Sequence, residues 1–202
     1  MRHSKGGYQM AKRVFFSFHY KDVADFRANV VRNHWRAKPD REICGYYDAS
    51  IWESAQKQGE VALKRLINSG LDQTSNTCVL IGSKTYERPW VRYELLKSFK
   101  KGNHIFGVHI NSIKCKDAQT KIKGPNPLEY VGVTFSDSGL TATLYELVNG
   151  KWIKYDKIDG SCSYRVEVAQ KYRGNGYNLS KLYNVYDWVD DDGFNNFSTW
   201  VG

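Results

Sequence analysis

The sequence has no run of 18 consecutive apolar residues, so no segment is suited to a membrane-spanning helix. Its four cysteines form no C-x-x-C pair, and its five histidines form no H-x-x-x-H pair, which argues against a metal site. It has no G-x-S-x-G elbow of a serine hydrolase. The GNG triplet at 174–176 does not join a strand to a helix, as a phosphate-binding loop does. We therefore expect a protein without metal ligands and without membrane contact.

The first nine residues, MRHSKGGYQ, are polar and precede a second methionine, Met10. They lack the apolar region of a signal peptide, so we interpret residues 1–9 as an unstructured leader or tag. The remaining length suggests a single domain over residues 10–202. Cys44 and Cys78 lie in apolar runs, which predicts buried free thiols and a cytoplasmic location.

The composition is that of a globular protein, with 41% hydrophobic and 25% charged residues. The net charge is +9, and Arg2 and Lys5 of the leader contribute two of these charges. This excess suits an anionic ligand such as a nucleotide, and it suits nucleic acid or solubility equally well. The basic residues are scattered, with no run longer than pairs such as Lys100–Lys101. The absence of a basic stripe argues against nucleic-acid binding.

Short strand candidates alternate with amphipathic segments through the first half of the chain. The strand candidates are residues 13–18, 42–50, 77–82 and 104–110. The inward positions of the helices between them are Val23, Phe26, Val30, Val31 and His34 in the first, Ala62, Leu63, Leu66 and Ile67 in the second, and Val91, Leu95 and Phe99 in the third. The second helix is expected to stop at 68–70, and the third to run from Pro89 to Gly102. This order predicts an α/β fold with a mostly parallel central sheet and helices on both faces.

The last third of the chain breaks this rhythm. Two alternating segments flank Asn149–Gly150, which predicts an antiparallel hairpin decoration near 133–158. The segment LSKLYNVYDWVDDD, residues 179–192, predicts a terminal helix. Its expected inward positions are Leu182, Val185, Tyr186 and Val189.

Ligands of open parallel sheets bind at the carboxyl ends of the strands. The expected strand ends here are residues 17–19, 47–50, 82–85 and 109–111. Glu94 lies about one turn into the helix that follows the third strand, where the helix dipole favours an ionised carboxylate by roughly 0.3–1 kcal/mol. His19 and His109 also lie at strand ends, either as acid–base groups or as hydrogen-bonded structural residues.

Glu94 and Trp90 each have two interpretations at this stage. Trp90 lies one turn before Glu94 on the same helical face, so the two residues could form a ring-binding corner. Alternatively, Glu94 is a surface residue paired with Lys97 or Lys101, and Trp90 is a packing residue. Position alone does not decide between them.

Two motifs resemble those of TIR domains. VFFSFHYKD, residues 14–22, resembles their opening strand and loop, and WVRYEL, residues 90–95, resembles the Trp-x-x-x-Glu element of TIR domains that cleave NAD. Residues 10–202 as a whole, including TCVLIGS, KGPNP and the aromatic tail, are similar to the TIR-like proteins of the bacterial Thoeris antiphage defence system. The resemblance implies a flavodoxin-like TIR fold.

The resemblance also implies an NAD-consuming enzyme, with NAD as substrate and no cofactor. Such enzymes break the nicotinamide–ribose bond and release a cyclic or modified ADP-ribose signal, which activates a ThsA-like effector. Glu94 matches the catalytic glutamate of the family, and homo-oligomers are a family expectation. Because nicotinamide leaves as a neutral molecule, one carboxylate near the ribose is enough to stabilise the oxocarbenium-like transition state.

The resemblance and the strand ends together give a set of expected substrate contacts. They are Phe16, Ser17, His19, Asp48, Trp52, Ser83, Trp90, Tyr93 and Asn111. Aromatic members of this region could exclude water, which cyclisation requires. The chain departs from the family at residues 19–21, His-Tyr-Lys, where TIR domains often carry an arginine.

Three other functions compete with this one. A non-catalytic TIR scaffold acting by homotypic assembly is the main alternative, although it has no need of the Trp90-to-Glu94 element. Nucleic-acid binding predicts a clustered basic face and a steep salt dependence. A nucleoside deoxyribosyltransferase-like enzyme uses a glutamate as nucleophile in a different motif.

Overall fold

The computed structural model describes residues 12–19, 26–38, 41–44, 49–115 and 117–202. The predicted leader at 1–9 lies outside these residues. A five-stranded sheet in the order β10-β4-β3-β1-β2 forms the centre, and all its neighbouring strands are parallel. Its strands are β1 (Lys12–Phe18), β2 (Arg41–Cys44), β3 (Asn76–Ile81), β4 (His104–His109) and β10 (Val185–Asp187). The predicted α/β class is therefore confirmed.

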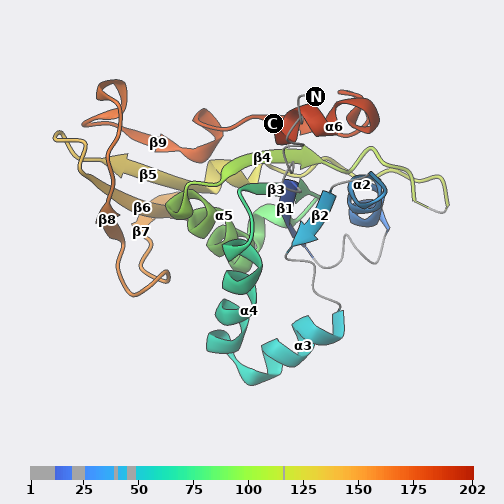
Figure 1. Ribbon diagram of the computed structural model, residues 1–202, viewed down its shortest axis with the longest axis horizontal. Coiled ribbons are helices and arrows are strands. Elements are labelled where there is room, and N and C mark those ends of the chain that lie inside the picture. The colour runs from blue at the N-terminus through green and yellow to red at the C-terminus, as the bar shows by residue number, and fades with distance from the viewer. Residues whose placement is uncertain (1–11, 20–25, 39–40, 45–48, 116) are drawn as a thin grey trace, which may run out of the picture.

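Helices cover both faces of this sheet (Figure 1). The helices of the described residues are α2 (Arg27–Arg36), α3 (Ala49–Gln58), α4 (Glu60–Asp72), α5 (Pro89–Lys101) and α6 (Gly193–Val201). Trp35 of α2 and Phe197 of α6 belong to the apolar cluster on one face, and Leu95 and Leu96 of α5 belong to the cluster on the other. Helices α4 and α3 extend away from the sheet toward the bottom of the view.

A second sheet lies beside the first, at the left of Figure 1. It has the order β7-β6-β5-β9, with β8 also paired to β6, and all its pairs are antiparallel. Its strands are β5 (Val131–Phe135), β6 (Thr141–Val148), β7 (Lys151–Lys154), β8 (Ser163–Arg165) and β9 (Gly176–Asn178). The predicted hairpin is β6–β7, and its turn residues Asn149 and Gly150 have φ of 48° and 75°, as a type I′ turn requires. The hairpin is thus one part of a larger antiparallel sheet.

Local signals explain the elements that carry the site. Strand β3 is buried at every position, as a central parallel strand should be. Helix α5 begins at Pro89 and ends at Gly102, whose φ of 85° closes the helix in the left-handed region. Short 3₁₀ segments connect the other elements: η1 (Thr85–Glu87), η2 (Pro127–Tyr130), η3 (Gln170–Tyr172) and η4 (Leu179–Lys181).

The predicted helix over residues 179–192 is wrong. This segment contains η4 and then β10, which hydrogen-bonds in parallel beside β4. Val185 and Tyr186 lie in the strand, and Val189 is 51% exposed after it. The edge of the sheet supplies backbone partners that a helical interpretation ignores. The terminal helix is α6, which begins at Gly193.

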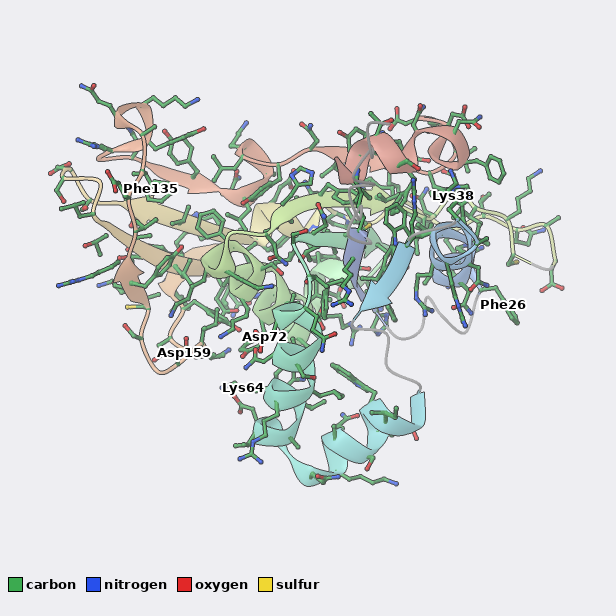
Figure 2. All side chains as sticks on the ribbon, in the orientation of Figure 1. Phe26, Lys38, Lys64, Asp72, Phe135 and Asp159 are labelled. Carbon is green, nitrogen blue, oxygen red and sulfur yellow. The ribbon has the colours of Figure 1, made fainter. Side chains whose placement is uncertain are left out.

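The predicted faces of the first two helices also need correction. Phe26 precedes α2 with a φ of 62° and is 58% exposed, so it points away from the body of the molecule (Figure 2). Val30 is also exposed, and the apolar residues that face the core are Ala28, Val31 and Trp35. Val23 lies outside the described residues.

The second predicted helix is longer than expected. Helix α4 continues past 68–70 to Asp72, and its buried residues are Leu63, Ile67 and Leu71. Of the helices in the described ranges, none has the length and apolarity needed to cross a membrane.

Candidate active site

A cavity of about 280 Å³ opens where the carboxyl end of β1 meets α3 and the first turns of α5. Parallel α/β sheets bind ligands in this position. The described residues that line it are Phe16, Phe18, His19, Trp52, Gln56, Arg88, Pro89, Trp90, Val91 and Glu94. Segments far apart in the sequence therefore converge on one small space.

Glu94 lies at the inner side of this cavity and is only 7% exposed. The Ser17 hydroxyl on β1 donates a hydrogen bond of 2.5 Å to Glu94 Oε2. This bond joins the central sheet to α5 and fixes the carboxylate in one orientation. Helix α5 is buried on a broad face that also includes Val91 and Leu95, which explains how a glutamate on it is removed from solvent.

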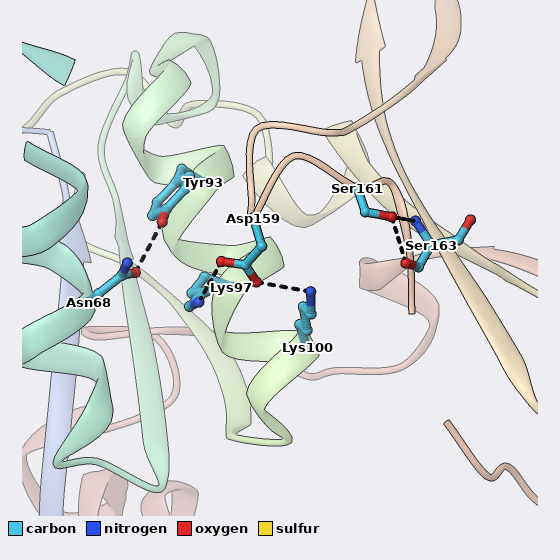
Figure 3. A network of polar contacts seen from close by, with 7 residues as sticks. All are labelled: Asn68, Tyr93, Lys97, Lys100, Asp159, Ser161 and Ser163. Atoms are coloured by element: carbon cyan, nitrogen blue, oxygen red, sulfur yellow. Dashed lines mark hydrogen bonds and ion pairs between the residues drawn. The ribbon is translucent and has the colours of Figure 1, made fainter. Parts of the chain in front are cut away.

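The alternative in which Glu94 pairs with a lysine at the surface is wrong. Lys97 and Lys100 both contact Asp159, at 3.6 and 3.0 Å, as Figure 3 shows. Lys101 donates to two backbone carbonyl oxygens at the end of α4 and after it. Glu94 is therefore a buried carboxylate facing a cavity.

Burial has a large electrostatic effect on this carboxylate. It raises the pKa of Glu94 from 4.5 to about 8, and the hydrogen bond from Ser17 opposes that rise. Glu94 is thus mostly protonated at neutral pH. A cationic group bound beside it would lower its pKa and favour the ionised form.

Aromatic rings enclose the space around Glu94. The ring centroids of Trp52 on α3 and Trp90 on α5 lie 6.4 Å apart with their planes nearly perpendicular. Trp90 also contacts Tyr93 edge-on, at a centroid distance of 5.8 Å. Such an arrangement can hold a flat ring and exclude water from it.

The structure brings together five of the predicted site residues at this cavity: Phe16, His19, Trp52, Trp90 and Glu94. Ser17 is not among the described lining residues, but its hydroxyl is hydrogen-bonded to Glu94, which is.

The other predicted contacts are not among the described lining residues. Tyr93 directs its hydroxyl to Asn68 on α4 at 3.0 Å (Figure 3), and it is not among the described lining residues. Ser83 and Asn111 are likewise absent from the described lining. Asp48 lies outside the described residues.

Two polar lining residues were not predicted as contacts. Gln56 lies one turn after Trp52 on α3, and this spacing could have indicated a shared face. Arg88 immediately precedes α5 and stands two residues before Trp90, and this position in the sequence could have indicated that it lies at the site.

The second histidine at a strand end is not part of the described cavity lining. His109 is buried, which lowers its pKa to about 4, and its Nδ1 has no hydrogen-bond partner in the described part of the chain. The described residues also contain no group of three or more His, Cys, Asp or Glu side chains that could hold a metal ion.

A parallel sheet with a buried carboxylate at its carboxyl edge is the arrangement expected of an enzymatic TIR-like α/β domain, and comparison with known proteins identifies the family. The family model described as "Thoeris protein ThsB, TIR-like domain" matches residues 15–114, which include Ser17 and Glu94. A curated protein of Bacillus cereus (strain MSX-D12), "Putative cyclic ADP-D-ribose synthase ThsB1", is 56% identical over 194 residues, covering 95% of this chain and 100% of that protein. The chain belongs to the Thoeris ThsB TIR-like family, which confirms the predicted resemblance.

Proposed function

We propose that this protein is an NAD-consuming enzyme that breaks the nicotinamide–ribose bond and makes a cyclic or otherwise modified ADP-ribose. The observation that carries the proposal is the buried Glu94 carboxylate in an aromatic cavity. The name of the relative, a cyclic ADP-D-ribose synthase, supports the same chemistry, since such a product is made from NAD.

Glu94 is proposed as the catalytic residue. Cleavage of the bond to nicotinamide places positive charge on the ribose, and a carboxylate held close to it stabilises that charge. The bond from Ser17 fixes the carboxylate before the reaction, so little reorganisation is needed as charge develops. The cationic nicotinamide ring also favours the ionised form of Glu94 when the substrate binds.

The proposed substrate contacts are the aromatic residues around this carboxylate. Trp52 and Trp90 come from separate helices and approach within 6.4 Å between ring centroids. Phe16 on β1 and His19 just after that strand line the same space. A wall of this kind limits access of water to the ribosyl cation, which favours capture by a group of the substrate itself over hydrolysis.

The product is proposed to act as a diffusible signal for a separate effector protein, of the ThsA type, in antiphage defence. Membership of the Thoeris family supports this role. The proposed place of this chemistry is the cytoplasm, where NAD and the effector are both available.

The test is an assay of purified protein with NAD, alone and with extract from phage-infected cells. Release of nicotinamide together with a product of cyclic ADP-ribose mass, separated by chromatography, is the expected result. Activity only with the extract would show that a trigger gates the enzyme. If the protein consumes no NAD with or without the extract, and Glu94→Gln still supports defence in cells, the scaffold alternative would be favoured.

A further inference from the structure

Arg88 brings a positive charge to the same cavity as Glu94. Its side chain is 37% exposed, and its two contacts are long. Arg88 Nε donates to the Lys84 carbonyl oxygen at 3.4 Å, and Nη2 lies 3.6 Å from Glu87 Oε2. Within the described residues, Nη1 makes no hydrogen bond. The guanidinium therefore keeps donors for a ligand, and its planar fork suits the oxygens of a phosphate.

The start of α5 adds to this positive potential. The helix runs for 13 residues from Pro89, no side chain of the described residues caps its N-terminus, and its first turn holds no acidic residue. Its first residues, Pro89, Trp90 and Val91, line the cavity next to Arg88. Backbone N–H groups and the positive end of the helix dipole favour an anion at this position.

The buried carboxylate places a limit on where such an anion can bind. Glu94 lies six residues beyond Arg88, or about 9 Å along the helix axis at 1.5 Å per residue. A phosphate beside the ionised carboxylate of Glu94 would be repelled, whereas one beside Arg88 would be attracted. The cavity is thus acidic at its inner end and basic at its mouth.

A nicotinamide dinucleotide has the complementary arrangement. Its cationic ring and the anionic pyrophosphate are separated by one ribose, so ribose at Glu94 directs the phosphates toward the mouth. The cavity of about 280 Å³ is just below the usual range for small-molecule sites, which suits only part of the dinucleotide, its nicotinamide riboside half. We infer that Arg88 and the N-terminus of α5 form a phosphate-binding subsite that holds the pyrophosphate of the substrate. This inference rests on the proposed function for its choice of ligand.

The subsite also accounts for the departure at residues 19–21. TIR domains often carry an arginine after the first strand, and this chain has none there. Arg88 brings a guanidinium to this cavity from the residue that precedes the helix carrying the glutamate.

The test measures affinity for ADP-ribose, which has the pyrophosphate but lacks the nicotinamide. Calorimetry gives its Kd for wild type, Arg88→Ala, Arg88→Lys and Lys84→Ala, and turnover gives KM and kcat for NAD. Lys84 is the matched control, because it is an exposed cation of the same loop that is not among the described lining residues. Adenosine, which lacks phosphate, is the control ligand.

Arg88→Ala is expected to weaken ADP-ribose binding roughly tenfold to a hundredfold, as loss of hydrogen bonds to a charged group does. In Arg88→Ala the KM for NAD should also rise, while kcat and the Kd for adenosine should change little. Arg88→Lys should recover part of the lost affinity for ADP-ribose. The subsite would be overturned if Arg88→Ala and Lys84→Ala weakened ADP-ribose binding equally. It would also be overturned if the Kd of Arg88→Ala for ADP-ribose stayed within about twofold of wild type. Binding of ADP-ribose is measured without turnover, so a failure of the proposed NAD cleavage would be seen separately.

Discussion

The contact between Ser17 and Glu94 carries most of the chemistry at the residue scale. A carboxylate that is 93% buried has an unfavourable ionised form, and a single hydroxyl donor offsets only part of that cost. The site is therefore built to become charged when a cation enters it.

Ser17→Ala removes the donor that lowers the pKa of Glu94. The pKa should rise further above about 8, so the ionised fraction at neutral pH decreases. We expect kcat/KM for NAD to fall roughly tenfold at neutral pH, the worth of one hydrogen bond to a charged group, and to recover as pH rises. A pH–rate profile checks this.

The control for Ser17→Ala is Ser98→Ala. Ser98 is also buried on α5, and its hydroxyl lies 2.8 Å from Thr77 Oγ1, outside the described cavity lining. It should lower stability without moving the profile. Profiles that coincide for wild type and Ser17→Ala would show that Ser17 does not influence the reacting carboxylate.

Glu94 also links stability to pH. Its pKa is about 8 in the folded protein and near 4.5 in the unfolded chain, so between these values unfolding releases a proton. Wild type should therefore lose stability as pH rises from about 4.5 to about 8, and level off above that. Glu94→Gln has no such proton to release. Its free energy of unfolding relative to wild type should therefore increase between pH about 4.5 and about 8, by a few kcal/mol at most.

Urea unfolding at a series of pH values measures this difference. Glu129→Gln is the control, because Glu129 is an exposed carboxylate on η2 and should follow wild type. Parallel stability curves for wild type and Glu94→Gln would contradict the account of a protonated buried glutamate.

The sequence predicted the position of Glu94 on its helix but not its burial. The helical position of Glu94 and its Trp-x-x-x-Glu spacing were readable, but its burial was not, because Lys97 stands at an equally suitable distance along the helix. Only the loop carrying Asp159 shows that this lysine is engaged elsewhere (Figure 3).

At the scale of elements, α5 and α6 show what a sequence pattern can predict. Pro89 and Gly102 mark the two ends of α5 by backbone chemistry that is independent of the rest of the fold. Helix α6 is bounded by Asp192 and Gly202, but it contains Asn195 and Asn196, which are poor helix formers. Tertiary packing of Phe197 stabilises it, and that packing cannot be read from a short window of sequence.

Phe197→Ala tests how much the terminal helix contributes. Phe197 is fully buried and its ring contacts Phe16 on β1, Trp35 on α2 and Phe106 on β4, at centroid distances of 6.0, 5.4 and 5.7 Å. Truncation should lower the free energy of unfolding by about 3–5 kcal/mol, the usual cost of removing a buried phenylalanine.

Phe194→Ala is the matched control, since Phe194 is on the same helix and 65% exposed. It should change stability by well under about 1 kcal/mol. Thermal and urea unfolding measure both variants, and equal effects would mean that α6 is not docked as described.

At the scale of the whole molecule, the two sheets share one apolar core. The same cluster contains Phe15 of β1 and Leu95 of α5 together with Val133 of β5 and Leu144 of β6. This continuity supports the proposal that residues 10–202 form a single domain. The parallel order of the first sheet followed from the alternation of strands and helices. The placement of β10 depends on its pairing with β4, a contact between residues far apart in the sequence that a local pattern does not show.

The measurement that tests the central claim most directly is nicotinamide release from NAD by wild type, Glu94→Gln and Glu129→Gln under the condition in which wild type is active. The account predicts a rate for Glu94→Gln reduced at least about a hundredfold, with its fold intact by circular dichroism, and an unchanged rate for Glu129→Gln. A Glu94→Gln protein that releases nicotinamide at the wild-type rate would contradict it.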